Sequence, residues 1–213
     1  MKKYSKAGLL IITLVIPALI FTFLRFFATN HYNIPYYFPI TEDHGKVKIV
    51  DGDTLFYKVE RFSATGSDGK AIAQDLFAGK LTVVNYLPKH CGDSCQVLQN
   101  SLERIYSLRD KVEALRLLTV SSNAKDIASF SERVGWAAIS VLPDKLNDIL
   151  LHTFRFDTSV PKAKTNSMES KLLLIDTESH IRGYYNGYDP EEINRLMAEI
   201  KILDFEKKEG SRN

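Results

Sequence analysis

The stretch LTVVNYLPKHCGDSC, residues 81–95, joins an apolar run to a turn that carries both cysteines of the chain. β-branched, aromatic and aliphatic side chains such as Val83, Val84 and Tyr86 dominate the run, which is typical of a strand buried on both faces of a sheet. Pro88 ends the strand, because proline has no backbone N–H to donate to a neighbouring strand. The stretch therefore predicts a buried strand that stops directly before two thiols.

The two thiols have the spacing C-x-x-x-C. If a helix begins near Gly92, Cys91 and Cys95 lie one turn apart, so both sulfur atoms lie on one side of its first turn. Free backbone N–H groups and the positive end of the helix dipole at this position favour thiolate over thiol. The spacing therefore predicts a site for redox or soft-metal chemistry.

The composition fits one folded domain with additional segments. The chain has 213 residues, a formal net charge of +2 and 45% hydrophobic residues, which is enough for one sizeable core. No basic stripe with interleaved aromatic residues is present, so we set nucleic-acid binding aside. Two cysteines cannot build a disulfide scaffold, and the four-ligand spacing of a structural zinc site is absent.

An apolar run, Ala7–Leu24, follows three lysines near the start of the sequence. A helix of about 20 such residues spans a bilayer, and the lysines favour the cytoplasmic side. The alternative is a cleaved signal peptide, but the run is longer than an ordinary signal core and no A-x-A site follows it. We expect residues 1–28 to form a cytoplasmic stub and an uncleaved transmembrane helix, with the rest of the chain outside the cytoplasm.

The remaining sequence predicts a tether, a folded domain and a tail. Residues 29–60 are expected to form an extracytoplasmic tether and a hairpin around Asp51-Gly52-Asp53, and residues 205–213 a disordered tail. Within residues 61–204 we expect strands at 81–87, 115–120, 138–142, 171–176 and 181–185, and helices at about 92–109, 124–134, 144–151, capped by Asp144, and 190–203. This order predicts an α/β fold with a mixed sheet and places the cysteine turn at the carboxyl end of a central strand.

The cysteine pair after the first central strand resembles the thioredoxin superfamily, and finer features resemble the SCO/SenC copper-chaperone family within it. The matching parts are the block FSATGSDGKAIAQDLFAGKLTVVNY (Phe62–Tyr86), the C-x-x-x-C spacing of Cys91 and Cys95, and the ending LLLIDTESHIRGYYNGYDPEEINRLMAEI (Leu172–Ile200). The resemblance covers about Phe62–Leu203. It implies a thioredoxin-like mixed sheet flanked by helices, preceded by one N-terminal transmembrane helix.

Members of that family bind copper outside the cytoplasm and help to assemble the copper centre of cytochrome c oxidase, and some act as thiol–disulfide reductants. The resemblance therefore implies copper as the bound metal. It also implies that the partner is the copper-site subunit of cytochrome c oxidase or another extracytoplasmic thiol protein. The implied location is the bacterial inner membrane, with the domain on the extracytoplasmic side.

The family's copper site adds a histidine eight residues before the aspartate that ends the LLxD strand. Counting back from Asp176 leads to Met168, so the third ligand differs here. Two thiolates and a thioether select Cu(I), whereas Cu(II) would lose its preferred imidazole. His90 is the alternative third donor, although a residue adjacent to Cys91 is better placed to act on the thiol through its charge. Met168 filling a gap in a loop is the competing interpretation.

Three functions remain open for the cysteine pair. In a redox role Cys91, nearer the helix start, attacks and Cys95 resolves the mixed disulfide. A general thiol–disulfide oxidoreductase without copper, or a binding module with a structural disulfide, would use the same pair. A peroxiredoxin needs a hydroxyl residue where Pro88 stands, and a TlpA-like reductase needs a cis-proline where Glu169 and Ser170 stand. We interpret His152 and His180 as structural residues.

Overall fold

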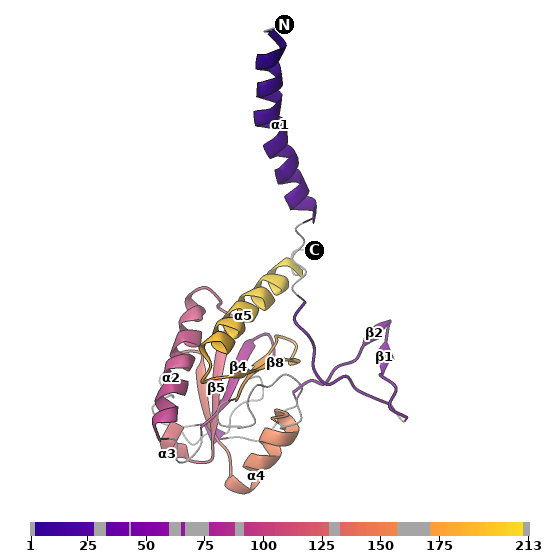
Figure 1. Ribbon diagram of the computed structural model, residues 1–213. Helices are drawn as coiled ribbons and strands as arrows, with labels where there is room; N and C mark the ends of the chain where they lie inside the picture. Colours follow the sequence, from indigo (N-terminus) through magenta and orange to yellow (C-terminus); the bar gives the residue numbers. More distant parts are fainter. Residues whose placement is uncertain are drawn as a thin grey trace. The chain divides into compact units, whose positions relative to one another are not determined.

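The structure is a computed structural model that describes residues 3–27, 33–42, 44–59, 65–66, 77–87, 92–127, 133–156 and 171–210 (Figure 1). The chain divides into two compact units, Met1–Asn33 and Ile34–Asn213. Residues 34–59 of the predicted tether and hairpin thus fall in the same unit as the domain that follows.

The first unit contains one helix, α1 (Lys3–Phe27), with Pro17 inside it. Large apolar side chains in its middle, from Ile11 to Phe23, are exposed. Over the described residues, no helix combines the length and the apolar character that crossing a membrane requires. The anchor predicted over residues 7–24 gains no support from this finding and stays a prediction.

The second unit is built on a six-stranded mixed sheet with the strand order β3-β6-β5-β4-β7-β8. The strands are β3 (Thr65–Gly66), β4 (Leu81–Tyr86), β5 (Leu115–Ser121), β6 (Trp136–Ser140), β7 (Lys171–Ile175) and β8 (Ile181–Asn186). The pairs β4–β5 and β5–β6 are parallel, and the other three are antiparallel. The predicted mixed sheet is therefore confirmed, and the strand before the cysteines lies inside it.

Helices cover both faces of this sheet (Figure 1). One face packs against α2 (Gly92–Tyr106) and α5 (Pro190–Gly210), and its core includes Leu81, Val83 and Leu98. The other face carries Val84 and Leu118, and it packs against α4 (Pro143–Asp148), the π-helical turn Ile149–Thr153 and two phenylalanines after that turn. The alternation of Val83 and Val84 between the two cores is the period-2 pattern of a strand buried on both faces.

The boundaries predicted for the helix at 144–151 and for the strand at 138–142 are wrong. The helix predicted at 144–151 begins with Pro143, whose fixed φ suits the first helical position, so Asp144 lies in the first turn and does not cap it. The strand predicted at 138–142 is β6, which starts at Trp136. The described part of the helix predicted at 124–134 is α3 (Ala124–Ile127).

The predicted disordered tail, residues 205–213, is wrong for residues 205–210, because α5 continues to Gly210. Two contacts hold these last turns. Lys208 Nζ pairs with Asp204 Oδ2 at 2.6 Å, and Lys207 Nζ donates to the Gly79 carbonyl at 3.1 Å. The charged residues that suggested fraying therefore stabilise the end of the helix.

The hairpin predicted around Asp51-Gly52-Asp53 is confirmed as β1 (Ile49–Val50) paired antiparallel with β2 (Asp53–Thr54). The segments on either side of it bind the edge of the large sheet and the turn before β8. Tyr37 N–H donates to the Ile181 carbonyl at 3.1 Å, and Val59 N–H donates to the Ser179 carbonyl at 2.8 Å.

Candidate thiol site at the carboxyl end of strand β4

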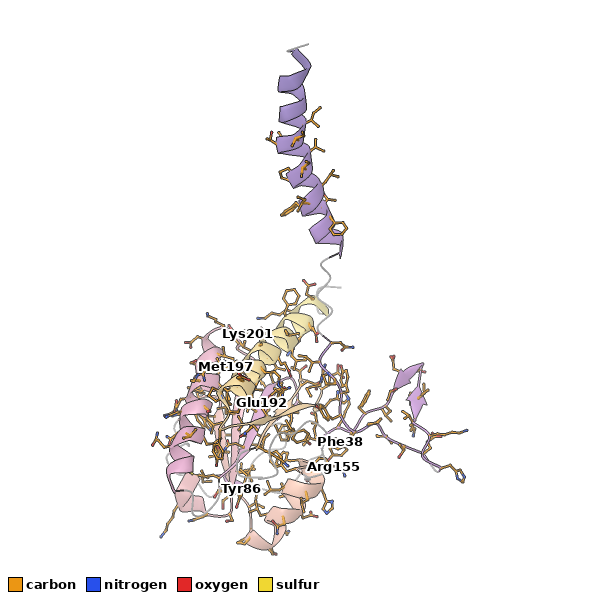
Figure 2. All side chains as sticks on the ribbon, viewed as in Figure 1. Phe38, Tyr86, Arg155, Glu192, Met197 and Lys201 are labelled. Atoms are coloured by element: carbon orange, nitrogen blue, oxygen red, sulfur yellow. The ribbon has the colours of Figure 1, made fainter. Side chains whose placement is uncertain are left out.

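The site lies where β4 ends and α2 begins. β4 is flanked by β5 and β7, its first five residues are buried, and Figure 2 places Tyr86 at one end of the sheet. Residues 88–91 lie outside the described residues, and α2 starts at Gly92. A strand of buried residues followed by a helix brings the amino end of that helix to the carboxyl end of the strand, as the sequence predicted.

Cys95 lies in the first turn of α2, is half-buried, and is disulfide-bonded. The only other cysteine of the sequence is Cys91, which lies outside the described residues. Cys95 precedes Leu98 by three positions and Leu102 by seven, and both leucines are at most 2% exposed. Because residues at this spacing share one face of a helix, Cys95 lies on the side of α2 that packs against the sheet.

A buried polar network lies in the sheet on the same side. Trp136 Nε1 donates to Thr119 Oγ1 at 2.9 Å, and the Thr119 hydroxyl donates to Asn85 Oδ1 at 2.8 Å. Asn85 and Thr119 are fully buried register partners on β4 and β5. The Asn85 Nδ2 atom has no hydrogen-bond partner among the described residues. The sequence did not indicate Asn85 as a site residue. The pattern of a strand does not show whether a single polar side chain in it is buried or which groups it contacts.

Lys171 is a second residue that sequence reasoning missed. It begins β7, the antiparallel neighbour of β4, and only 1% of it is exposed. Leu172 pairs with Asn85 in the register of the two strands, so Lys171 lies at the end of the sheet where β4 leads to the cysteines. Its position directly before the apolar run LLLI could have indicated that Lys171 is buried, because all five residues of β7 are buried.

The predicted third donors cannot be placed. Met168 and His90 both lie outside the described residues. Within the described ranges, no three His, Cys, Asp or Glu side chains gather closely enough to hold a metal ion. The described part of the site therefore supplies one soft donor, the Cys95 sulfur.

The other two histidines that we interpreted as structural lie away from Cys95. His152 is exposed, with Nε2 3.8 Å from Asp148 Oδ1. His180 is buried, with Nδ1 3.6 Å from Asp176 Oδ2. Burial lowers the pKa of His180, and the Asp176 carboxylate opposes that shift.

Asp176 belongs to a second buried polar cluster at the opposite end of β4, where Thr82 pairs with Ile175. Its Oδ1 accepts the N–H groups of Glu178 and His180, both at 2.9 Å, and its Oδ2 accepts Arg182 Nη1 at 3.0 Å. Arg182 also donates from Nη2 to the Ile34 carbonyl at 2.7 Å. This cluster, which we call the Asp176–Arg182 clamp, attaches the start of the tether to β8.

Comparison with known proteins supports the fold. No protein-family model and no curated protein matches the sequence. Among solved structures the chain is similar to BsSco, a member of the Sco family of cytochrome c oxidase assembly proteins in which a disulfide switch was identified. The identity is 16%, the TM-score is 0.56, and 72% of this chain and 96% of that chain are covered.

Two further similar structures have the same family name. An SCO1/SenC family lipoprotein from Bacillus anthracis has a TM-score of 0.53 at 16% identity, covering 69% of this chain and 95% of that one. Arabidopsis thaliana ScoI with copper bound has a TM-score of 0.52 at 16% identity, covering 68% and 99%. These three structural neighbours are Sco or SenC proteins, and the thioredoxin-like fold that the sequence resemblance implied is confirmed.

Proposed function

We propose that this chain is an Sco-like thiol protein that takes part in assembling the copper centre of a cytochrome c oxidase, either by delivering Cu(I) or by reducing the thiols that receive it. One observation carries the proposal. Cys95 is disulfide-bonded in the first turn of the helix that follows an interior strand of a thioredoxin-like sheet. Open α/β sheets place their chemistry at the carboxyl ends of such strands.

The chemistry of the pair suits both roles. When reduced, Cys91 and Cys95 would offer two thiolates, which are soft ligands and select Cu(I). Met168 would complete the ligand set with a thioether, and His90 is the alternative donor. The copper here is cargo, which the chain would receive after its disulfide is reduced and pass to the copper-site subunit of the oxidase.

In the reductant role, the Cys91 thiolate attacks a disulfide of the partner protein and forms a mixed disulfide, releasing one partner thiolate. The Cys95 thiolate then attacks the Cys91 sulfur and releases the second partner thiolate. Two electrons pass to the partner, which ends as a dithiol, and this chain ends with the disulfide in which Cys95 is found.

The cellular location is a separate part of the proposal. A stable disulfide is typical of an oxidising compartment, which supports the extracytoplasmic side of a bacterial inner membrane. The lysines before Ala7–Leu24 support an anchor with a cytoplasmic N-terminus. Extraction of membranes at alkaline pH tests this part, because a bilayer-spanning chain stays in the pellet whereas a peripheral chain is released.

A general thiol–disulfide oxidoreductase is the second candidate. The disulfide at Cys95 favours it, because that bond needs no metal. A binding module with an inert disulfide is the third. Reduction by a small dithiol at neutral pH, without unfolding, separates the second candidate from the third.

The decisive experiment is an anaerobic Cu(I) titration of the reduced full-length protein in mild detergent. We expect about one tightly held Cu(I) per chain, in line with two thiolates sharing one ion, and loss of tight binding in Cys95→Ser. Met168→Ala should weaken Cu(I) retention more than Met197→Ala, a control at a methionine on α5 that packs against the core (Figure 2). His90→Ala tests the alternative donor. A wild-type chain that binds no Cu(I) would refute the copper role and leave the redox role.

A further inference from the structure

We propose that Asn85 is a positioning residue for the redox step: its Nδ2 amide donates a hydrogen bond to the Cys95 thiolate in the reduced form and so favours reduction of the disulfide. This inference rests on the proposed redox function of the cysteine pair. It adds a residue that neither the sequence pattern nor the Cys-x-x-x-Cys spacing indicates.

The polar network places the oxygen of the Asn85 amide, and not its nitrogen, against Thr119. An indole N–H can only donate, so Trp136 Nε1 occupies a lone pair of the Thr119 hydroxyl, at 2.9 Å. The Thr119 hydrogen is then free to point to Asn85 Oδ1, at 2.8 Å. With Oδ1 engaged as the acceptor, the two hydrogens of Nδ2 are directed away from Thr119.

The Nδ2 group is a buried donor that the described residues leave unsatisfied. Asn85 and Thr119 are 0% exposed and Trp136 is 2% exposed, and Nδ2 has no partner among the described residues. Buried amide donors are normally paired, since an unpaired one destabilises the fold. This unpaired donor is therefore available to the Cys95 sulfur, which becomes a stronger acceptor when the disulfide is reduced to the thiolate.

The position of Asn85 brings it to the Cys95 side of the sheet. Val83 and Leu81, on alternate positions of β4, belong to the core that includes Leu98 and Leu102 of α2. Asn85 follows Val83 by two residues, so it lies on the same face, one step nearer the carboxyl end of β4. Cys95 precedes Leu98 by one helical turn, so it lies one step nearer the amino end of α2. The amide and the sulfur therefore occupy the same end of the same interface.

The charge on the sulfur decides which redox form a hydrogen bond from Asn85 favours. Reduction by a dithiol reagent breaks the S–S bond of Cys95, transfers two electrons to the cysteine sulfurs, and leaves the reagent as a disulfide. A thiolate sulfur carries negative charge and accepts a hydrogen bond more strongly than a neutral disulfide sulfur does. The Asn85 amide therefore stabilises the reduced form more than the oxidised form and raises the reduction potential of the pair.

The test equilibrates the full-length protein with reduced and oxidised glutathione and measures the fraction of dithiol by thiol alkylation. We expect the equilibrium constant for reduction to fall about tenfold in Asn85→Leu, which is about 30 mV for a two-electron couple. Trp136→Phe is the matched control, because it removes a hydrogen bond of the same network but leaves Thr119 holding Asn85. It should leave the constant within about twofold of the wild type, or about 9 mV on the same scale.

The outcomes separate this inference from the proposed function. If the wild-type disulfide does not exchange with glutathione, the redox function itself is refuted. If the wild type exchanges and Asn85→Leu has the same constant, only the role of Asn85 is refuted. Should Asn85→Leu fail to fold, Thr119→Val decides, since it keeps the amide but frees it to turn. A lower constant in Thr119→Val supports the inference, and an unchanged constant overturns it.

Discussion

The two buried polar clusters at the opposite ends of β4 differ in which group is left unpaired and in what the paired groups hold together. In the Asp176–Arg182 clamp, both carboxylate oxygens of Asp176 accept hydrogen bonds, and Arg182 donates to Asp176 and to the Ile34 and Pro35 carbonyls. The unpaired atom there is the ring nitrogen Nδ1 of His180, which lies 3.6 Å from Asp176 Oδ2 and has no hydrogen-bond partner among the described residues. In the second network, Trp136 donates to the Thr119 hydroxyl and that hydroxyl donates to Asn85 Oδ1. The Asn85 Nδ2 group has no partner within the described part of the chain.

The segments that each cluster joins separate a structural cluster from one suited to chemistry. The clamp joins segments nearly 150 residues apart in sequence, so its pairing holds the tether on the sheet. The Asn85 network joins neighbouring strands that the sheet already holds together. We therefore expect changes in the clamp to alter stability alone, and changes of Asn85 or of the Thr119 hydroxyl that holds it to alter the redox equilibrium as well.

The largest effect is expected from Arg182→Met. Removing the guanidinium leaves the Asp176 carboxylate buried without its cation, and breaking a buried ion pair from one side destabilises by about 3–5 kcal/mol. The free energy of unfolding, measured by urea denaturation of the oxidised protein, should fall accordingly, while the glutathione equilibrium of the native protein stays unchanged.

The double variant Asp176→Asn with Arg182→Met is the control for that prediction. It removes the stranded charge, so it should recover part of the lost stability. If Arg182→Met shifted the glutathione equilibrium as strongly as Asn85→Leu, the assignment of the two clusters to separate roles would be contradicted.

A smaller loss of stability is expected from Thr119→Val. The substitution keeps the shape of the side chain but leaves Asn85 Oδ1 and Trp136 Nε1 without their buried partner, which is expected to destabilise by about 1–3 kcal/mol. Urea denaturation measures this loss. A loss in Thr119→Val below about 0.5 kcal/mol would show that the network contributes less than ordinary buried hydrogen bonds do.

Tyr36→Leu should cost less than either change. The Tyr36 ring lies 3.8 Å from the Arg182 guanidinium carbon and stacks on Phe56, but the residue is 43% exposed. Exposed cation–π contacts contribute about 0.5–1 kcal/mol. Tyr36→Phe retains the ring and should be close to the wild type in urea denaturation. Equal losses in both variants would assign the effect to the hydroxyl group.

The sequence predicts the parts of this fold that depend on local pattern. The run at residues 81–87 and the run KLLLI became β4 and β7, and Asp189-Pro190 marks the start of α5, with Asp189 Oδ1 accepting the Glu191 N–H. Hydrophobic period, proline geometry and helix capping act within a few residues, so they can be interpreted from one sequence.

The parts that the sequence did not predict depend on distant contacts. The tether joins the domain because Arg182 reaches the carbonyls of Ile34 and Pro35, and no local pattern near residue 34 indicates that partner. In the candidate site, C-x-x-x-C indicated the thiols, but the importance of Asn85 follows from which of its atoms remains unpaired after Thr119 and Trp136 are placed. Such an unpaired atom is a property of the packed structure.

The smallest expected effect is a pH dependence of stability at the clamp, carried by His180. Burial lowers the pKa of His180 from the ordinary value of 6.5, and the cations Lys58 and Arg182 lower it further. The Asp176 and Glu178 carboxylates oppose this shift. The unfolded chain therefore binds a proton at a higher pH than the folded chain does. Stability should be full above about pH 6.5 and should decline as the pH falls from there toward the lower pKa of the folded state.

The measurement is the urea midpoint between pH 7.5 and pH 5, compared with His180→Gln and with His152→Gln, a control at an exposed histidine. His180→Gln should flatten part of the decline, because an amide cannot take up the proton, whereas His152→Gln should retain the decline of the wild type. If the urea midpoints of the wild type and of His180→Gln decline equally between pH 7.5 and pH 5, protonation of His180 does not cause the pH dependence of stability. In either case the glutathione equilibrium of His180→Gln should match the wild type, because His180 lies at the opposite end of β4 from Asn85 and Cys95.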